Sequence, residues 1–177
     1  MAQSIFITGG ARSGKSTFAE QSALKFGDPL AYLATAQSLD QEMNDRISKH
    51  QQRRSNIWQT IEEPLQLSRT LTGIDGKYRA ILVDCLTLWL SNLLFLHEAL
   101  GDKAEERILE DVGQLATTLR DMTTPVIVVS NEVGMGIVPE HRLGRIFRDI
   151  AGRANQILAA EANEAWLMVS GLPLKLK

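Results

Sequence analysis

Residues 5–17 read Ile-Phe-Ile-Thr-Gly-Gly-Ala-Arg-Ser-Gly-Lys-Ser-Thr, and this stretch decides the fold of the chain. An apolar run typical of a β-strand ends in a glycine-rich turn, and a helical pattern begins at about Lys15. Gly9, Gly14, Lys15 and Ser16 match the spacing of a phosphate-binding loop, G-x-x-x-x-G-K-[ST]. Glycines let the backbone bend so that N–H groups point at an anion, and the following helix presents its positive end to that anion. We therefore expect a bound nucleoside triphosphate, with Lys15 on its phosphates; a glycine turn that matches by chance is the alternative.

Length and composition describe an ordinary globular chain. The 177 residues are 44% hydrophobic and 23% charged, which predicts a single nucleotide-binding domain over residues 1–177. A net charge of −2 gives no general attraction to nucleic acid or to anionic membranes. The single cysteine, Cys85, suits a reducing compartment, and the apolar run 86–96 is too short to span a bilayer. We expect a cytoplasmic protein with no membrane span.

Apolar strand patterns alternate with helical patterns along the whole chain. This alternation predicts an α/β fold, a mainly parallel central sheet flanked by helices. In such sheets, ligands bind at the carboxyl ends of the strands. The expected strands are 5–8, 30–34, 57–61, 78–84, 126–130, 165–170 and 172–177, and the expected helices are 15–26, 39–54, 65–71, 85–98, 104–122 and 142–162.

An acid ends one of the buried strands. Asp84 follows Ile81-Leu82-Val83, and an acid at a strand end beside a phosphate loop holds the water shell of Mg²⁺. With the Ser16 hydroxyl, Asp84 is our candidate metal-binding residue. The alternative is an aspartate that only caps the helix after it.

The predicted helix 39–54 is very polar. Glu42, Arg46, His50 and Arg53 recur at spacings of three or four and share one face. This face is either a solvated surface of ion pairs or a wall of the active site. In the second interpretation, His50 is a nucleophile toward phosphorus, with cations on either side of it. His97 and His141 are weaker candidates because of their positions at helix ends.

The C-terminal half holds two further features with open interpretations. The loop Asn131–Pro139 follows an apolar strand and either contacts the γ-phosphate or substrate, or only shapes a turn. The second feature is a group of arginines on the last helix, which forms a cationic face for phosphate or another subunit, or merely faces solvent. Its members are Arg142, Arg145, Arg148 and Arg153.

Several of these segments, in this order, resemble one family. They are the phosphate loop, Glu42-Met43 with Arg46-Ile47 and His50, Trp58 with Thr60 and Glu62, 83–87, and 131–140 running on to Arg148–Arg153. The chain resembles the bifunctional adenosylcobinamide kinase / adenosylcobinamide-phosphate guanylyltransferases of cobalamin biosynthesis. The resemblance implies a RecA-like P-loop NTPase fold and a homotrimer. It also implies two reactions: ATP or GTP phosphorylates adenosylcobinamide, and GTP then guanylylates a histidine that passes GMP to the new phosphate.

The resemblance also assigns residues. His50 is the guanylylated histidine, since Lys49-His50 leaves one candidate in that segment, and Lys15 serves the kinase step. Mg²⁺ is expected on Ser16 and Asp84. The implied nucleotide contacts are Gly9, Gly10, Ala11, Arg12, Ser13, Gly14, Lys15, Ser16, Ala34, Thr35, Ala36, Gln51, Gln52, Arg53, Arg54, Glu62 and Asp84.

Three other functions remain as alternatives. A simple small-molecule kinase would use the His50 helix only as a lid. A non-catalytic GTP switch is disfavoured because the chain lacks the Asn-Lys-x-Asp motif that reads guanine. A RecA-like motor on nucleic acid is disfavoured by the acidic balance and by the lack of a basic, aromatic-rich groove.

Overall fold

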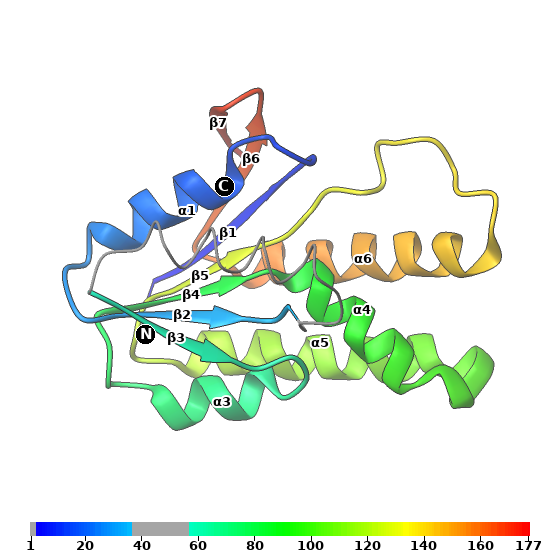
Figure 1. The fold of residues 1–177 in the computed structure, drawn as a ribbon, viewed down its shortest axis with the longest axis horizontal. Helices are drawn as coiled ribbons and strands as arrows, with labels where there is room; N and C mark the ends of the chain where they lie inside the picture. Colours follow the sequence, from blue (N-terminus) through cyan, green and yellow to red (C-terminus); the bar gives the residue numbers. More distant parts are fainter. Residues whose placement is uncertain (1–2, 37–56) are drawn as a thin grey trace.

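The computed structural model describes residues 3–36 and 57–177. Seven strands in this part of the chain form one sheet in the order β3-β2-β4-β5-β1-β6-β7 (Figure 1). Every neighbouring pair is parallel except β6 and β7, which form an antiparallel hairpin at one edge. The strands are β1 (Ser4–Gly9), β2 (Leu30–Ala34), β3 (Trp58–Glu62), β4 (Ala80–Asp84), β5 (Val126–Val129), β6 (Glu164–Val169) and β7 (Leu172–Lys175).

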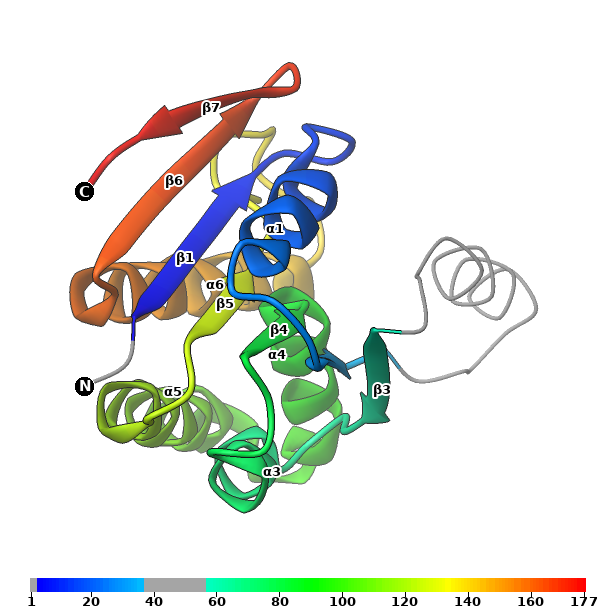
Figure 2. The same cartoon turned by 90° about the vertical axis from the view of Figure 1, so that its left-hand side faces the viewer.

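Helices cover both faces of the sheet. One face packs against α1 (Lys15–Leu24), and the other packs against the remaining helices, as Figure 2 shows. Those helices are α3 (Leu67–Ile74), α4 (Leu86–Leu96), α5 (Ala104–Asp121) and α6 (Arg142–Glu161); the 3₁₀ helix η1 (Glu98–Lys103) connects α4 to α5. The central strands are buried on both sides, which explains their unbroken runs of Ile, Leu and Val. The predicted α/β fold with a mainly parallel sheet is confirmed.

The sequence pattern predicted the ends of most helices and strands to within two or three residues of the observed ends. Helix α1 ends at Leu24 rather than Phe26, because Gly27 follows with a positive φ and Asp28-Pro29 breaks the helix. Helix α3 lies later than expected, at Leu67–Ile74 instead of 65–71, and the two residues before it, Leu65 and Gln66, donate their N–H groups to the Glu63 carboxylate. The helix predicted over residues 39–54 lies outside the described residues.

The strand register aligns the carboxyl ends of four neighbouring strands. Glu62 of β3 pairs with Ala34 of β2, which pairs with Asp84 of β4, which pairs with Val129 of β5. The glycine-rich loop leaves β1 at this same edge, on the other side of β5. The predicted contact residues at strand ends therefore come together. Within the described residues, no helix is long and apolar enough to cross a membrane.

Candidate functional site

The glycine-rich loop connects β1 to α1 and takes conformations that glycine makes accessible. Gly9 and Gly14 have φ angles of +152° and +94°, and Arg12 lies in the left-handed region at +57°. A Cβ on Gly9 would lie 2.5 Å from the carbonyl oxygen of Met168 and 2.8 Å from Ser13 Oγ. No side chain fits there. Gly9 is therefore required by close packing against β6 as well as by its backbone angle.

The loop is held from outside by two segments that are distant in sequence. The N–H of Gly171, in the β6–β7 turn, donates to the carbonyl of Ser13 at 3.0 Å. The N–H of Glu132, after β5, donates to the carbonyl of Gly9 at 2.9 Å. Gly14 packs so closely on the same turn that a Cβ there would lie 3.2 Å from the Cα of Gly171. These contacts fix the loop before any ligand binds, which is the preorganisation that anion binding needs.

Lys15 begins α1 and is buried against the loop that it follows. Its Nζ donates to the carbonyl of Gly10 at 2.6 Å. Burial lowers the pKa of Lys15 because it removes water from the ammonium group, and the nearby Cys85 and Asp84 oppose that shift. The first N–H groups of α1 have no acceptor within the helix, so they remain to bind an anion.

Two hydroxyls beside the loop are buried with no hydrogen-bond partner within the described part of the chain: Thr8 Oγ1 and Ser13 Oγ. Leaving a buried hydroxyl unpaired costs about 1–3 kcal/mol. Both hydroxyls lie next to the glycines that shape the loop. A bound phosphate would bring acceptor oxygens to this region, so the unpaired groups fit a nucleotide site.

The oxygens of Ser16 and Asp84 meet at the carboxyl edge of the sheet. Ser16 Oγ lies 3.3 Å from Asp84 Oδ2, and the Tyr32 hydroxyl donates to the same oxygen at 2.8 Å. Hydroxyl and carboxylate oxygens are the ligands that Mg²⁺ prefers, and their position beside the phosphate loop fits a Mg²⁺–nucleotide complex. Across residues 3–36 and 57–177, no group of three or more His, Cys, Asp or Glu side chains is arranged so that it could hold a metal ion. The pair therefore fits a metal that takes its other ligands from phosphate and water.

Thr35 is a predicted contact residue whose side chain is engaged inside the protein. It is fully buried, and its hydroxyl donates to the carbonyl of Cys85 at 2.7 Å and accepts from the Cys85 N–H at 2.9 Å. Its own carbonyl accepts from Asn92 Nδ2 at 2.9 Å. Thr35 thus ties the end of β2 to the start of α4. Its neighbours Ala34 and Ala36 lie at the carboxyl edge.

Cys85, whose backbone binds the Thr35 hydroxyl, is itself buried. Burial raises the pKa of its thiol to about 11, and the Asp84 charge adds to the shift. The thiol therefore stays protonated at neutral pH and gives no nucleophile to the site.

Two adjacent acids at the end of β3 have different surroundings. Glu62 is exposed at the edge, where a ligand would meet it. The Glu63 carboxylate instead accepts from the N–H groups of Leu65 and Gln66 and from the Thr70 hydroxyl. Burial acts to raise the pKa of Glu63, but these hydrogen bonds outweigh it and hold the pKa below its usual value. Sequence reasoning missed this contact, which holds the turn that leads into α3.

The arginines of α6 bind two different partners within the chain. Arg148 Nη2 donates to the carbonyl of Gly134 at 2.6 Å, and Arg145 Nη1 donates to the carbonyl of Pro139 at 3.0 Å. Both bind the loop that follows β5. Arg153 instead forms an ion pair with Glu105 at 2.8 Å. These three side chains are therefore engaged within the chain, which neither open interpretation of the arginine group anticipated.

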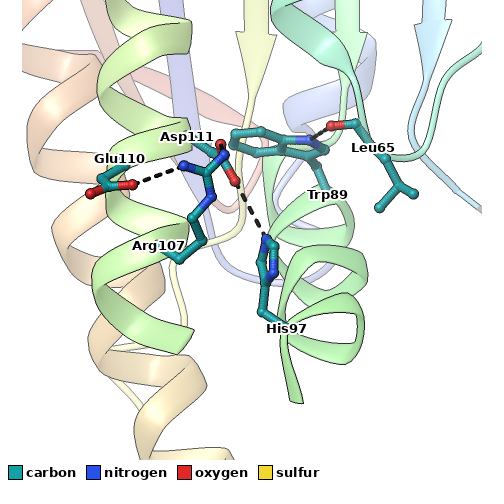
Figure 3. A network of polar contacts seen from close by, with 6 residues as sticks. All are labelled: Leu65, Trp89, His97, Arg107, Glu110 and Asp111. Carbon is teal, nitrogen blue, oxygen red and sulfur yellow. Dashed lines mark hydrogen bonds and ion pairs between the residues drawn. The ribbon is translucent and has the colours of Figure 1, made fainter. Parts of the chain in front are cut away.

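His97 ends α4 in a polar network away from the phosphate loop. Its Nε2 lies 3.6 Å from Asp111 Oδ2, and Arg107 contacts Asp111 and Glu110 at 3.0 and 2.9 Å (Figure 3). The Trp89 indole N–H donates to the carbonyl of Leu65 beside it. The network links α4 to α5, and the contact of His97 with Asp111 gives His97 a role in holding these two helices together. His50 and residues 51–54, the predicted nucleophile and its flanking contacts, lie outside the described residues.

Comparison with known proteins decides the family. The sequence pattern of the family described as "Cobinamide kinase / cobinamide phosphate guanyltransferase" matches residues 5–176. The chain belongs to this family. It is therefore an enzyme, and the family description names both a kinase and a guanyltransferase. This finding confirms the resemblance and disfavours the nucleotide switch and the nucleic-acid motor.

Relatives within the family are similar over nearly their full length. The chain is 43% identical over 182 residues to the "Bifunctional adenosylcobalamin biosynthesis protein CobU" of Escherichia coli, covering 98% of this chain and 99% of that protein. It is 45% identical over 183 residues to the protein of the same name from Salmonella typhimurium, with the same coverage. Both of these relatives are named as bifunctional proteins, and this chain is similar to them over nearly its whole length.

A solved structure supports the fold assignment. The RadB recombinase superposes with a TM-score of 0.50 and 16% identity, covering 93% of this chain and 73% of that protein. At this identity the likeness shows the fold alone, which is RecA-like. A nucleotide substrate follows from the family's two activities and from this fold.

Proposed function

We propose that this chain is a bifunctional transferase of cobalamin biosynthesis. It phosphorylates adenosylcobinamide with ATP or GTP, and then transfers GMP from GTP to the new phosphate, giving adenosylcobinamide-GDP. The family assignment supports the two activities. The observation that carries the proposal is the preorganised phosphate loop, with Lys15 inside it and the Ser16–Asp84 pair beside it.

In the kinase step, the substrate hydroxyl attacks the γ-phosphorus of the nucleotide. The bond to the bridging oxygen breaks, the nucleoside diphosphate leaves, and the hydroxyl loses its proton. The work of the protein is positioning and charge neutralisation. Lys15 leaves the carbonyl of Gly10 for the phosphates, and the N–H groups at the start of α1 bind phosphate oxygens. Ser16 and Asp84 would hold Mg²⁺, which would supply positive charge to offset the negative charge of the phosphates.

In the guanylyl step, a histidine divides one displacement into two. The imidazole of His50 attacks the α-phosphorus of GTP and pyrophosphate leaves; the phosphate of adenosylcobinamide phosphate then attacks the same phosphorus and releases His50. The imidazole must be neutral to attack. Arg46, Lys49 and Arg53 flank His50 in the sequence and would disfavour its protonated form.

The remaining parts of the proposal concern the nucleotide contacts and the assembly. The nucleotide would contact the edge formed by Ala34, Thr35, Ala36 and Glu62, and residues Gln51–Arg54. Thr35 takes part through its position, since its hydroxyl is engaged with Cys85. We propose a single domain over residues 1–177 and a homotrimer.

The test is product formation by the purified protein. Adenosylcobinamide incubated with GTP and Mg²⁺ should give adenosylcobinamide phosphate first and adenosylcobinamide-GDP later, identified by mass spectrometry. The Lys15→Ala variant should form neither product from adenosylcobinamide. A protein that stops at adenosylcobinamide phosphate would be a kinase alone, and the guanylyl half of the proposal would fail.

A further inference from the structure

An unusual set of side chains lies in the connection between β5 and α6. Met135 is 80% exposed, Ile137 is 96% exposed and Val138 is 61% exposed. Single exposed apolar residues are common on protein surfaces, but three large ones within four residues are a feature that calls for a partner. Figure 1 shows this connection standing away from the sheet, beyond the carboxyl ends of the strands.

The exposure is not a consequence of a loosely held loop. The Glu132 carboxylate accepts from the N–H groups of Gly134 and Met135. Arg148 donates to the carbonyl of Gly134 from the opposite side, and Arg145 binds the carbonyl of Pro139 at the far end. The backbone is therefore fixed at both ends. Its apolar side chains are presented to solvent at a defined place.

That place is next to the phosphate loop. The N–H of Glu132 donates to the carbonyl of Gly9 at 2.9 Å, and β5 lies between β1 and β4 in the sheet. The apolar residues begin three positions later. A second exposed apolar group, Phe95 with Leu96, lies at the far end of α4, whose eleven residues carry it about 16 Å from the carboxyl edge.

We propose that Met135, Ile137 and Val138 bind the corrin macrocycle of the acceptor substrate. The nucleotide is strongly charged and takes N–H groups and cations, so these side chains suit the other substrate. In that substrate the arm that is phosphorylated hangs from a large corrin macrocycle, which carries ring methyl groups as well as amide side chains and so offers apolar surface for contact. Contact between the macrocycle and the loop would place the arm toward Lys15. The flexible thioether of Met135 adapts to an uneven ring face. The inference rests on the proposed function and deepens it.

The test separates the binding of the two substrates. Ile137→Ser and Met135→Gln should each raise the KM for adenosylcobinamide in the kinase reaction by roughly tenfold, because apolar contact area is lost. The KM for the nucleotide, and kcat at saturating adenosylcobinamide, should stay at wild-type values. Phe95→Ser is the control, since it removes another large exposed apolar side chain, at the far end of α4, and it should leave all three constants unchanged.

Three results would overturn the inference. An unchanged KM for adenosylcobinamide in both variants would show that the loop does not bind it. A parallel rise in the nucleotide KM would show a general disturbance of the site. A change in sedimentation coefficient would show that the loop is a contact between copies of this chain instead. If the wild-type protein does not phosphorylate adenosylcobinamide at all, the proposed function fails first, and the inference fails with it.

Discussion

Gly9→Ala should disable the phosphate loop, whereas Gly10→Ala in the same loop should not. A Cβ at residue 9 would lie 2.5 Å from the carbonyl oxygen of Met168, which would have to retreat by about 0.9 Å to reach ordinary contact at 3.4 Å. That carbonyl belongs to β6, whose backbone is paired with β1 along its length, so it cannot move alone. A Cβ at residue 10 meets no atom within 4 Å, and Gly10 has no positive φ.

Two costs add at Gly9. Its φ of +152° is a conformation that side chains rarely adopt, which costs on the order of 1–2 kcal/mol. Overpacking against fixed backbone adds about 1–3 kcal/mol. Displacing the loop to relieve this strain would misplace its N–H groups, and even 2 kcal/mol corresponds to a roughly thirtyfold loss of affinity.

Isothermal titration with GTP and thermal unfolding measure the two consequences. We expect Gly9→Ala to bind GTP at least thirtyfold more weakly and to unfold at a lower temperature, while Gly10→Ala stays close to wild type in both. If Gly9→Ala binds GTP as the wild type does, the argument from loop packing is wrong. An equal loss in both variants would show that any added methyl group disturbs the loop, and close packing would not be the reason.

The remaining predictions concern the support of the site. Thr35→Val should lower the free energy of unfolding by about 1–3 kcal/mol in urea titrations, because it leaves the buried Cys85 N–H unpaired and removes one of the two hydrogen bonds to the Cys85 carbonyl, which keeps the one from the Trp89 N–H. Thr72→Val, which removes an exposed hydroxyl bonded only within α3, should cost much less, and equal losses would refute the role of the Thr35 hydroxyl. Asp75 should stabilise the protein in a pH-dependent way. Burial acts to raise its pKa, but hydrogen bonds from Thr123 and the following residue outweigh burial and hold the pKa below the usual 3.8. The stabilisation that the Asp75 carboxylate gives is therefore present above pH 3.8 and is lost as the pH falls through the lower pKa of the folded state. The difference in Tm between wild type and Asp75→Asn should shrink as the pH falls from 7 to below 3.8. A difference that stays constant over this range would contradict the argument.

Local sequence signals predicted the parts of the fold and site that depend on neighbouring residues. The phosphate loop, the buried strands and the acid after Ile81-Leu82-Val83 are short patterns whose meaning does not depend on distant contacts. The strand order then brought Asp84 to Ser16, because the carboxyl ends of parallel strands share one edge. The predicted helix boundaries were less accurate, since hydrogen bonds such as those of Glu63 to the residues before α3 leave no trace in the periodic pattern.

The parts that could not be predicted depend on contacts between distant segments. Gly171 reads as a turn residue, and nothing near it indicates that its N–H holds Ser13. The family resemblance implied a nucleotide contact at Thr35, but its hydroxyl is bonded to Cys85, fifty residues away. The sequence left Arg145 and Arg148 as either part of a cationic face or solvent-facing, and only the folded chain shows that they bind the loop after β5.

The nucleophilic role of His50 is the central claim, and covalent labelling tests it most directly. The protein is incubated with Mg²⁺ and GTP labelled at the α-phosphorus, and is then separated by denaturing electrophoresis. We predict that the wild-type protein retains the label, and that His50→Ala retains none while it still phosphorylates adenosylcobinamide. An unlabelled wild-type protein that forms adenosylcobinamide-GDP, or a His50→Ala variant that is labelled as strongly as the wild type, would contradict the account.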